Sequence, residues 1–315
     1  MQRIFTYHIT NTEHGMRTGD FLSQHGYSRH IRTYLKQHPG SVILNGEPAL
    51  FYFPLQAGDE LKICLKDEMP SEKIVPVPLP IHIIYEDEDL LIIDKQADTP
   101  IHPSIGNYEN TLANGIAWYY ESQGIPFVFR CINRLDRDTT GLLILSKNML
   151  SGAILSQQMK NREIHRTYLA LVEGCLPPSG TIDAPIGRVG DSVIERCVDP
   201  EHGEPAITHY QRLAYYPGSS FQGSSSDPAV LSHGISLAEL HLETGRTHQI
   251  RVHMTSIGHP LCGDTLYNPD TVHMNRQALH SHALEFVHPI TGEPLQFRAP
   301  LPADMMAALP LLQFR

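Results

Sequence analysis

The sequence predicts an α+β protein with a mixed, mainly antiparallel sheet, because two kinds of strand pattern occur with a few helical stretches between them. Four consecutive apolar residues, Leu142 to Leu145, need cover on both faces and predict a buried central strand. Residues 165–174 alternate apolar and polar side chains for most of their length, which is typical of a strand with one buried face. Helical patterns over residues 110–122 and 149–159 lie on either side of the first strand in the chain.

The first part of the chain predicts a small domain over residues 1–66. Phe5, Tyr7 and Ile9 alternate with polar neighbours as in a short strand, and a helical pattern follows over residues 16–25. Ser28 is a helix-capping residue, and the helix expected after it carries three cations: Arg29, Arg32 and Lys36. Two strands, over residues 42–44 and 60–63, complete the domain.

Residues 67–80 predict an extended linker that joins the two domains flexibly, since they combine acidic residues with four prolines. Residues 81–315 then form the second, larger domain, with the active cleft crossing its sheet. Within that domain, residues 217–228 are rich in Ser and Gly and predict a mobile surface loop, because such a composition cannot bury a core.

Composition restricts the kind of protein. A chain of 315 residues with 41% apolar and 18% charged residues is typical of a soluble globular protein. It lacks the long apolar run of a membrane helix and the features of a signal peptide, so we expect a cytoplasmic monomer without membrane contact. The five cysteines include no CxxC pair, and the 19 histidines supply no complete ligand set, so neither a disulfide framework nor a metal site is expected.

The net charge of -10 is unevenly distributed. Lys and Arg against Asp and Glu number 7 against 5 in residues 1–66, 2 against 9 in residues 67–98, and 15 against 20 in residues 99–315. The N-terminal domain is therefore slightly basic although the chain is acidic. Binding of RNA through a local basic face is compatible with this distribution.

The most informative stretch runs from Asn133 to Gly141 and leads directly into the buried strand. Its sequence is Asn-Arg-Leu-Asp-Arg-Asp-Thr-Thr-Gly, a charged loop at the mouth of an apolar strand. Asp136 could simply cap a turn or pair with a neighbouring arginine. Its place beside a buried strand end, where solvent can reach, also suits a reactive carboxylate.

This stretch resembles the signature of the RluA-type pseudouridine synthases, His-Arg-Leu-Asp followed by two variable residues and Thr-Ser/Thr-Gly. Asn133 stands where that family usually has His. Three further segments downstream match in the same order, and they include the strand with Arg166 and Tyr168 and residues 243–253, which contain Arg246. The resemblance covers roughly residues 81–302, and residues 1–66 resemble the small RNA-binding domain of the ribosomal protein S-four type.

The resemblance implies isomerisation of uridine to pseudouridine in structured RNA, without a cofactor, and most of all in large-subunit ribosomal RNA. It makes Asp136 the catalytic aspartate, as nucleophile or as base at the sugar. Arg246 would pair with Asp136, and such a pair typically lowers the pKa of a carboxylate by about one to three units. Arg134 would fill the gap left by the flipped nucleotide, Tyr168 would pack against the uracil or relay its C5 proton, and Leu135 would help to close the pocket.

Other hypotheses remain at the level of sequence. The same chemistry could act on transfer RNA, or the chain could be a catalytically silent RNA-binding or ribosome-assembly protein. Intact Asp136, Tyr168 and Arg246 argue against the silent protein. A nucleosidase for free nucleotides would have no use for the N-terminal domain.

Overall fold

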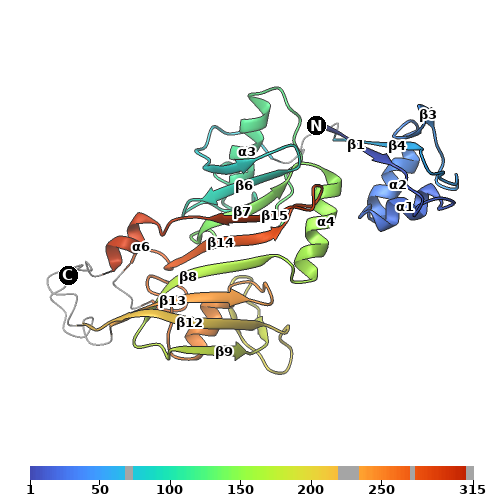
Figure 1. Ribbon diagram of the computed structural model, residues 1–315. Coiled ribbons are helices and arrows are strands. Elements are labelled where there is room, and N and C mark those ends of the chain that lie inside the picture. The colour runs from blue at the N-terminus through green and yellow to red at the C-terminus, as the bar shows by residue number, and fades with distance from the viewer. Residues whose placement is uncertain (68–73, 219–233, 270–273, 310–315) are drawn as a thin grey trace, which may run out of the picture.

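A computed structural model describes residues 1–67, 74–218, 234–269 and 274–309. The described residues form three sheets: a small one near the N-terminus, a large one that runs through the rest of the chain (Figure 1), and a separate pair of short strands. No helix in these ranges combines the length and the apolar character that a membrane span requires.

The small sheet has four strands in the order β1-β4-β2-β3, all paired antiparallel. Its elements are β1 (Gln2–His8), α1 (Thr18–Gln24), α2 (Arg29–Gln37), β2 (Val42–Leu44), β3 (Glu47–Pro48) and β4 (Glu60–Lys66). The Ser28 side chain accepts a hydrogen bond from the Ile31 amide, so the predicted cap of the second helix is confirmed. Apolar side chains of both helices and of the sheet share one core, which contains Phe5, Phe21, Ile31 and Ile63.

The small domain packs against the larger one and is not merely tethered to it. Its core also includes Leu150 of α4 (Met149–Lys160). Gly26 has φ +83°, and a Cβ added there would lie 2.6 Å from Ile154 Cγ1, so only glycine permits this approach of the two domains. The expectation of a flexible connection is therefore wrong for this structure, because residues distant in sequence complete the small domain's core.

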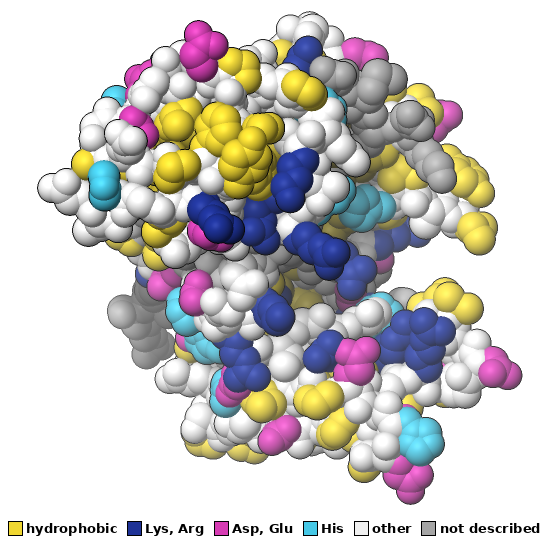
Figure 2. Space-filling view, turned by 90° about the vertical axis from the view of Figure 1, so that its right-hand side faces the viewer, with side chains coloured by type: hydrophobic (Ala, Val, Ile, Leu, Met, Phe, Trp, Pro, Cys, Tyr) yellow, Lys and Arg dark blue, Asp and Glu magenta, His cyan; other side chains and the backbone are white. Residues whose placement is uncertain are grey.

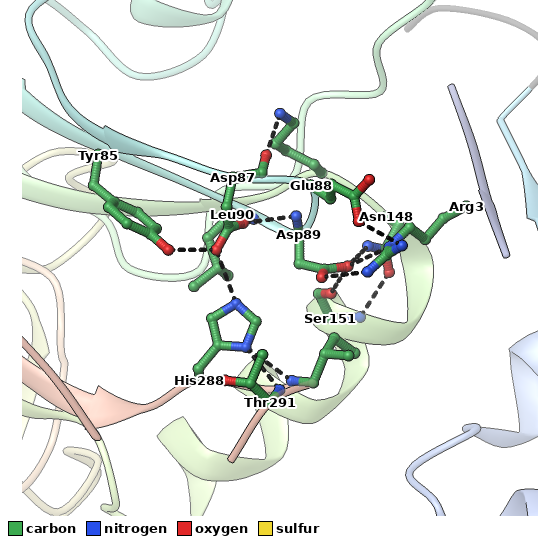
Figure 3. Close-up of polar contacts among 12 residues, drawn as sticks. Arg3, Tyr85, Asp87, Glu88, Asp89, Leu90, Asn148, Ser151, His288 and Thr291 are labelled. Atoms are coloured by element: carbon green, nitrogen blue, oxygen red, sulfur yellow. Dashed lines mark hydrogen bonds and ion pairs between the residues drawn. The ribbon is translucent and has the colours of Figure 1, made fainter. Parts of the chain in front are cut away.

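Polar contacts reinforce this packing at the turn between β5 (Ile83–Glu86) and β6 (Leu90–Lys95), shown in Figure 3. The Arg3 guanidinium donates to both carboxylate oxygens of Asp89, at 3.1 and 3.0 Å, and pairs with Glu88 at 2.7 Å. Asp89 is 4% exposed and also accepts from the Asn148 amide at 2.7 Å. The acidic turn thus receives a cation from the N-terminal domain.

The large sheet has nine strands and confirms the predicted mixed, mainly antiparallel α+β architecture. Eight strands follow the order β5-β6-β7-β14-β8-β13-β12-β9, and β15 pairs with β14. Among the described strands, β7 and β14 are the parallel pair and the others pair antiparallel. The remaining elements are α3 (Leu112–Glu121), β7 (Thr140–Ser146), β8 (His165–Glu173), β9 (Ser179–Asp183), β10 (Ile186–Arg188), β11 (Arg196–Val198), β12 (Ile207–Tyr216), β13 (Ile235–Leu242), α5 (Gln249–Ser256), β14 (Leu279–Val287), β15 (Pro294–Arg298) and α6 (Ala303–Ala308).

Strand β7 is buried along its whole length, as its apolar run predicts. Leu143 and Leu145 belong to the core that includes α3, whereas Leu142 and Ile144 face a second core that contains Leu155 of α4. At the start of the strand, a Cβ on Gly141 would lie 2.3 Å from the Ser281 carbonyl oxygen of β14. The glycine that ends the charged motif therefore allows the parallel pairing of β7 with β14.

The predicted insertion at residues 217–228 lies outside the described residues except for Pro217 and Gly218.

Candidate active site

A pocket of about 420 Å³ opens where the loop before β7 meets β8, the end of β13 and the start of α5. The structure brings five of the residues predicted from sequence to this pocket. They are Arg134, Leu135, Asp136, Tyr168 and Arg246.

The loop that carries Asp136 is fastened to β7 by a side-chain amide. The buried Asn133 donates from Nδ2 to the Leu142 carbonyl at 3.2 Å and accepts at Oδ1 from the Ile144 amide at 2.8 Å. Both backbone groups belong to the strand, so Asn133 joins the loop to the sheet edge. The residue that departs from the expected His has a positioning role here.

A buried lysine provides a second anchor for the same loop. Lys95 Nζ donates to the carbonyl oxygens of Gln96, Thr99 and Arg137, at 2.8, 3.0 and 2.7 Å. Burial lowers the pKa of Lys95 to about 7, although the nearby charges of Asp138 and Asp136 oppose that shift. One side chain thus ties residues 96–99 to the residue directly after Asp136.

The cation that pairs with Asp136 is Arg251, in the first turn of α5. Its Nη1 lies 3.0 Å from Asp136 Oδ2, and its Nε and Nη2 donate to the two oxygens of Asp264 at 2.8 and 2.9 Å. Burial alone would lower the pKa of Arg251, but the Asp264 hydrogen bonds and the Asp136 charge raise it above its ordinary value. The two-bond fork to the buried Asp264 fixes the guanidinium so that its remaining nitrogen faces Asp136.

The prediction that Arg246 pairs with Asp136 is wrong. Arg246 precedes α5 and points away from the carboxylate, since its Nε donates to the Pro205 carbonyl at 3.1 Å and its Nη1 pairs with Glu204. Helix α5 begins at Gln249, and His248 occupies the capping position directly before it. The pairing was implied by the family resemblance, but Arg246 lies outside the helix and has its own exposed partner.

A different signal in the sequence points to Arg251. It lies between Ile250 and Val252, and all three side chains are buried. A buried arginine needs anionic partners, and Asp264 follows thirteen residues later in a stretch of apolar and glycine residues.

Tyr168 lies on β8 between Leu240 of β13 and Ser281 of β14. It is buried yet lines the pocket, and its hydroxyl has no hydrogen bond within the described residues. The ring is therefore fixed by the sheet while its hydroxyl remains available to a ligand.

Two arginines at the pocket lack an anionic partner in the described ranges. Arg134 has neither a hydrogen bond nor an ion pair there, and Arg166 reaches the Thr244 carbonyl only at 3.4 Å. Arg166 Nε is buried and unpartnered. Such cations favour an anionic ligand, because that ligand would supply the missing acceptors.

The three other cations predicted from sequence are not at this pocket. Arg29, Arg32 and Lys36 line a second hollow of about 890 Å³ in the N-terminal domain, together with Arg17 and the exposed Tyr52. None of the four cations has an ion pair in the part of the chain that the structure describes. Seen from the side of this domain, Lys and Arg side chains gather on both sides of a hollow in the surface (Figure 2).

One group of side chains in the described ranges has the spacing of metal ligands: Asp87, Asp89 and His288. Their polar atoms already have protein partners. Asp87 accepts from His288 Nε2 at 3.0 Å and from two backbone amides, and Asp89 holds Arg3 (Figure 3). We assign this group to domain packing, because Arg3 already supplies the compensating positive charge.

The sheet, the pocket and its carboxylate define an enzyme that acts on an anionic substrate, and comparison with known proteins identifies the class. Residues 89–256 match the family model described as RNA pseudouridylate synthase. The chain belongs to this family, which isomerises uridine to pseudouridine in RNA.

Individual relatives agree. The chain is 40% identical to an uncharacterized RNA pseudouridine synthase, YjbO, of Bacillus subtilis (strain 168), over 92% of this chain and 97% of the relative. It is 35% identical to ribosomal large subunit pseudouridine synthase D of Neisseria meningitidis serogroup A, over 91% of this chain and 75% of the relative. Among solved structures, it resembles human RNA pseudouridylate synthase domain containing 1, with a TM-score of 0.54 and 25% identity over 70% of this chain and 83% of the human one.

Proposed function

We propose that this protein converts specific uridines of large-subunit ribosomal RNA to pseudouridine, with Asp136 as the catalytic carboxylate. The observation that carries the assignment of Asp136 is its geometry: it lies in the pocket, 27% exposed, with Oδ2 held at 3.0 Å by Arg251. Ribosomal RNA is favoured because several relatives bear the name ribosomal large subunit pseudouridine synthase D.

Asp136 acts at the sugar, either by attacking C1′ or as a base. In both cases the reaction needs a carboxylate beside the ribose, and the fixed Arg251 holds Oδ2 of that carboxylate in place. Asp264 supports this role indirectly, since it holds Arg251 in place. Asn133 and Lys95 fix the loop, so that the carboxylate meets the sugar in one orientation.

The target uridine must leave its stack to reach Asp136. Arg134 has no partner within the described ranges, so its planar guanidinium is free to take the place of the flipped base. Tyr168 and Leu135 provide apolar contact for the uracil, and the Tyr168 hydroxyl is placed to handle the C5 proton. Arg166 binds a phosphodiester oxygen next to the flipped nucleotide, which satisfies its buried Nε.

The N-terminal domain, of the S-four type, holds a structured part of the same RNA. Arg29, Arg32 and Lys36 supply positive charge for phosphate contacts, since none of the three forms an ion pair within the described residues. Because the domain packs on α4, these three cations lie at a fixed distance from Asp136.

Asp136→Asn tests the proposal, because it preserves shape and removes the carboxylate. We expect no detectable pseudouridine in RNA incubated with this variant, and RNA affinity within about twofold of the original protein. Chemical mapping of pseudouridine in ribosomal and transfer RNA, with and without the gene, identifies the substrate. Turnover by the Asn variant removes Asp136 from the mechanism, and a change confined to transfer RNA rejects the ribosomal substrate.

A further inference from the structure

His248 occupies an unusual backbone conformation directly beside Asp136. Its φ is 57° and its ψ 20°, which is the left-handed region that residues other than glycine rarely adopt. Its side chain makes no capping hydrogen bond to α5. This conformation costs free energy and places the imidazole in the pocket, where its side chain is 12% exposed.

The hydrogen bonds around the ring determine its tautomer. His248 Nδ1 lies 2.9 Å from the Tyr267 hydroxyl, and that hydroxyl oxygen accepts the Arg196 amide hydrogen at 2.9 Å. The Tyr267 hydroxyl hydrogen has no other acceptor among the described residues, which favours its donation to Nδ1. With this hydrogen bond, neutral His248 carries its own hydrogen on Nε2.

That Nε2–H group faces the reaction centre. Nε2 is 3.9 Å from Asp136 Oδ2, which is too long for a direct hydrogen bond, and no described residue accepts from it. The groups around the ring are Asp136, Asp264, Arg251 and Arg196, with charges of both signs. Burial lowers the pKa of His248, which keeps the imidazole neutral at neutral pH.

We infer that His248 is a further catalytic residue, which donates its Nε2–H hydrogen bond to a carbonyl oxygen of the uracil ring after the ring leaves the sugar. This inference rests on the proposed function. When the C1′–N1 bond breaks, its electron pair goes to the ring, and the negative charge spreads over O2 and O4. His248 transfers no proton. It stabilises this charge until the C5–C1′ bond forms, after which the C5 proton passes to solvent and N1 takes up a proton from solvent. A fixed neutral donor suits this task, since it stabilises charge that develops during the reaction.

The test measures the single-turnover rate of C5–C1′ bond formation in RNA from a strain that lacks this protein, grown with and without 5-fluorouracil. We expect His248→Leu to slow the reaction of uridine by about 10²–10³-fold, as loss of one such donor typically does, with unchanged RNA affinity. His248→Gln keeps an N–H donor and should recover part of the rate. His241→Leu, the same change at an exposed histidine on β13, is the control and should keep the original rate.

The fluorinated RNA separates charge stabilisation from a merely structural role. 5-Fluorouridine has fluorine in place of the C5 hydrogen, so its reaction stops once the C5–C1′ bond has formed, and formation of that bond is the readout for both nucleosides. Fluorine withdraws electrons and makes the detached ring anion more stable, so the defect of His248→Leu should shrink for 5-fluorouridine. An equal defect on both nucleosides overturns the inference. If the original protein isomerises neither nucleoside, the proposed function fails instead.

Nuclear magnetic resonance of ¹⁵N-labelled histidine tests the tautomer without any RNA. We expect the His248 signals of a neutral ring with hydrogen on Nε2 at neutral pH, and a smaller preference for that tautomer in Tyr267→Phe. A ring with hydrogen on Nδ1, or a charged ring at pH 7, contradicts the inference.

Discussion

Replacing Arg251 should destabilise the protein far more than replacing Arg246, although both arginines line the same pocket. Arg251→Met removes the guanidinium from Asp264, whose side chain is 1% exposed, and leaves a buried carboxylate with no cation. Removal of one partner of a buried pair typically costs about 3–5 kcal/mol of unfolding free energy. Arg246 is 37% exposed and pairs with the exposed Glu204, so Arg246→Ala should cost at most about 1 kcal/mol.

Urea unfolding followed by circular dichroism, at fixed salt, measures both changes. Arg251→Lys is the intermediate case, because one ammonium keeps the charge but cannot form the two-bond fork to Asp264 and also reach Asp136. We therefore expect partial stability and little pseudouridine formation from the Lys variant.

The double variant Arg251→Met/Asp264→Asn isolates the pair. Since the second change removes the unpaired charge, it should restore part of the lost stability. The reasoning is refuted if Arg246→Ala and Arg251→Met lose equal unfolding free energy, or if the double variant is no more stable than Arg251→Met.

Three further changes test other parts of the structure. Tyr168→Phe keeps the buried ring and loses the free hydroxyl: a severely slowed reaction assigns proton relay to the hydroxyl, whereas a retained rate leaves the ring a packing role only. Triple alanine substitution of Arg29, Arg32 and Lys36 should weaken RNA binding and flatten the slope of log affinity against log salt by about 0.7–0.9 per lost phosphate contact. An unchanged slope across a salt series means that these side chains form only a solvated surface. For Lys95, the folded-state pKa of about 7 lies below the ordinary 10.5, so the unfolded chain binds more protons between these values. The unfolding free energy of the original protein relative to Lys95→Met should therefore rise with pH from 7 upward, and a difference that is flat from pH 6 to 9 contradicts the burial of a titrating amine.

Much of the fold can be predicted from sequence because the signals are local. The apolar run at residues 142–145 has no polar position, so both faces of that strand must be buried, as they are in β7. The Ser28 side chain caps a helix that begins at the next residue. Gly141, the last residue of the charged motif, allows β7 to approach β14 closely. Asp136, Arg134 and Leu135 reach the pocket because they lie just before a strand that the sequence defines, and Tyr168 reaches it from within another such strand.

The tertiary structure alone decided which charges meet. Arg246 and Arg251 are five residues apart, and the apolar neighbours of Arg251 indicate that it is buried without indicating which carboxylate it meets. Whether a side chain faces the carboxylate depends on where α5 starts and on the position of Asp264, and both depend on packing between distant segments. The contact of Arg3 with Asp89 also depends on tertiary packing, because the two residues are 86 positions apart. This contact joins the two domains, although the proline-rich segment between them predicts a flexible connection. Hydrophobic periodicity and helix caps depend on a few neighbouring residues, so they can be recognised in the sequence. Ion pairs join residues that are distant in the chain, so their partners are determined only when the chain has folded.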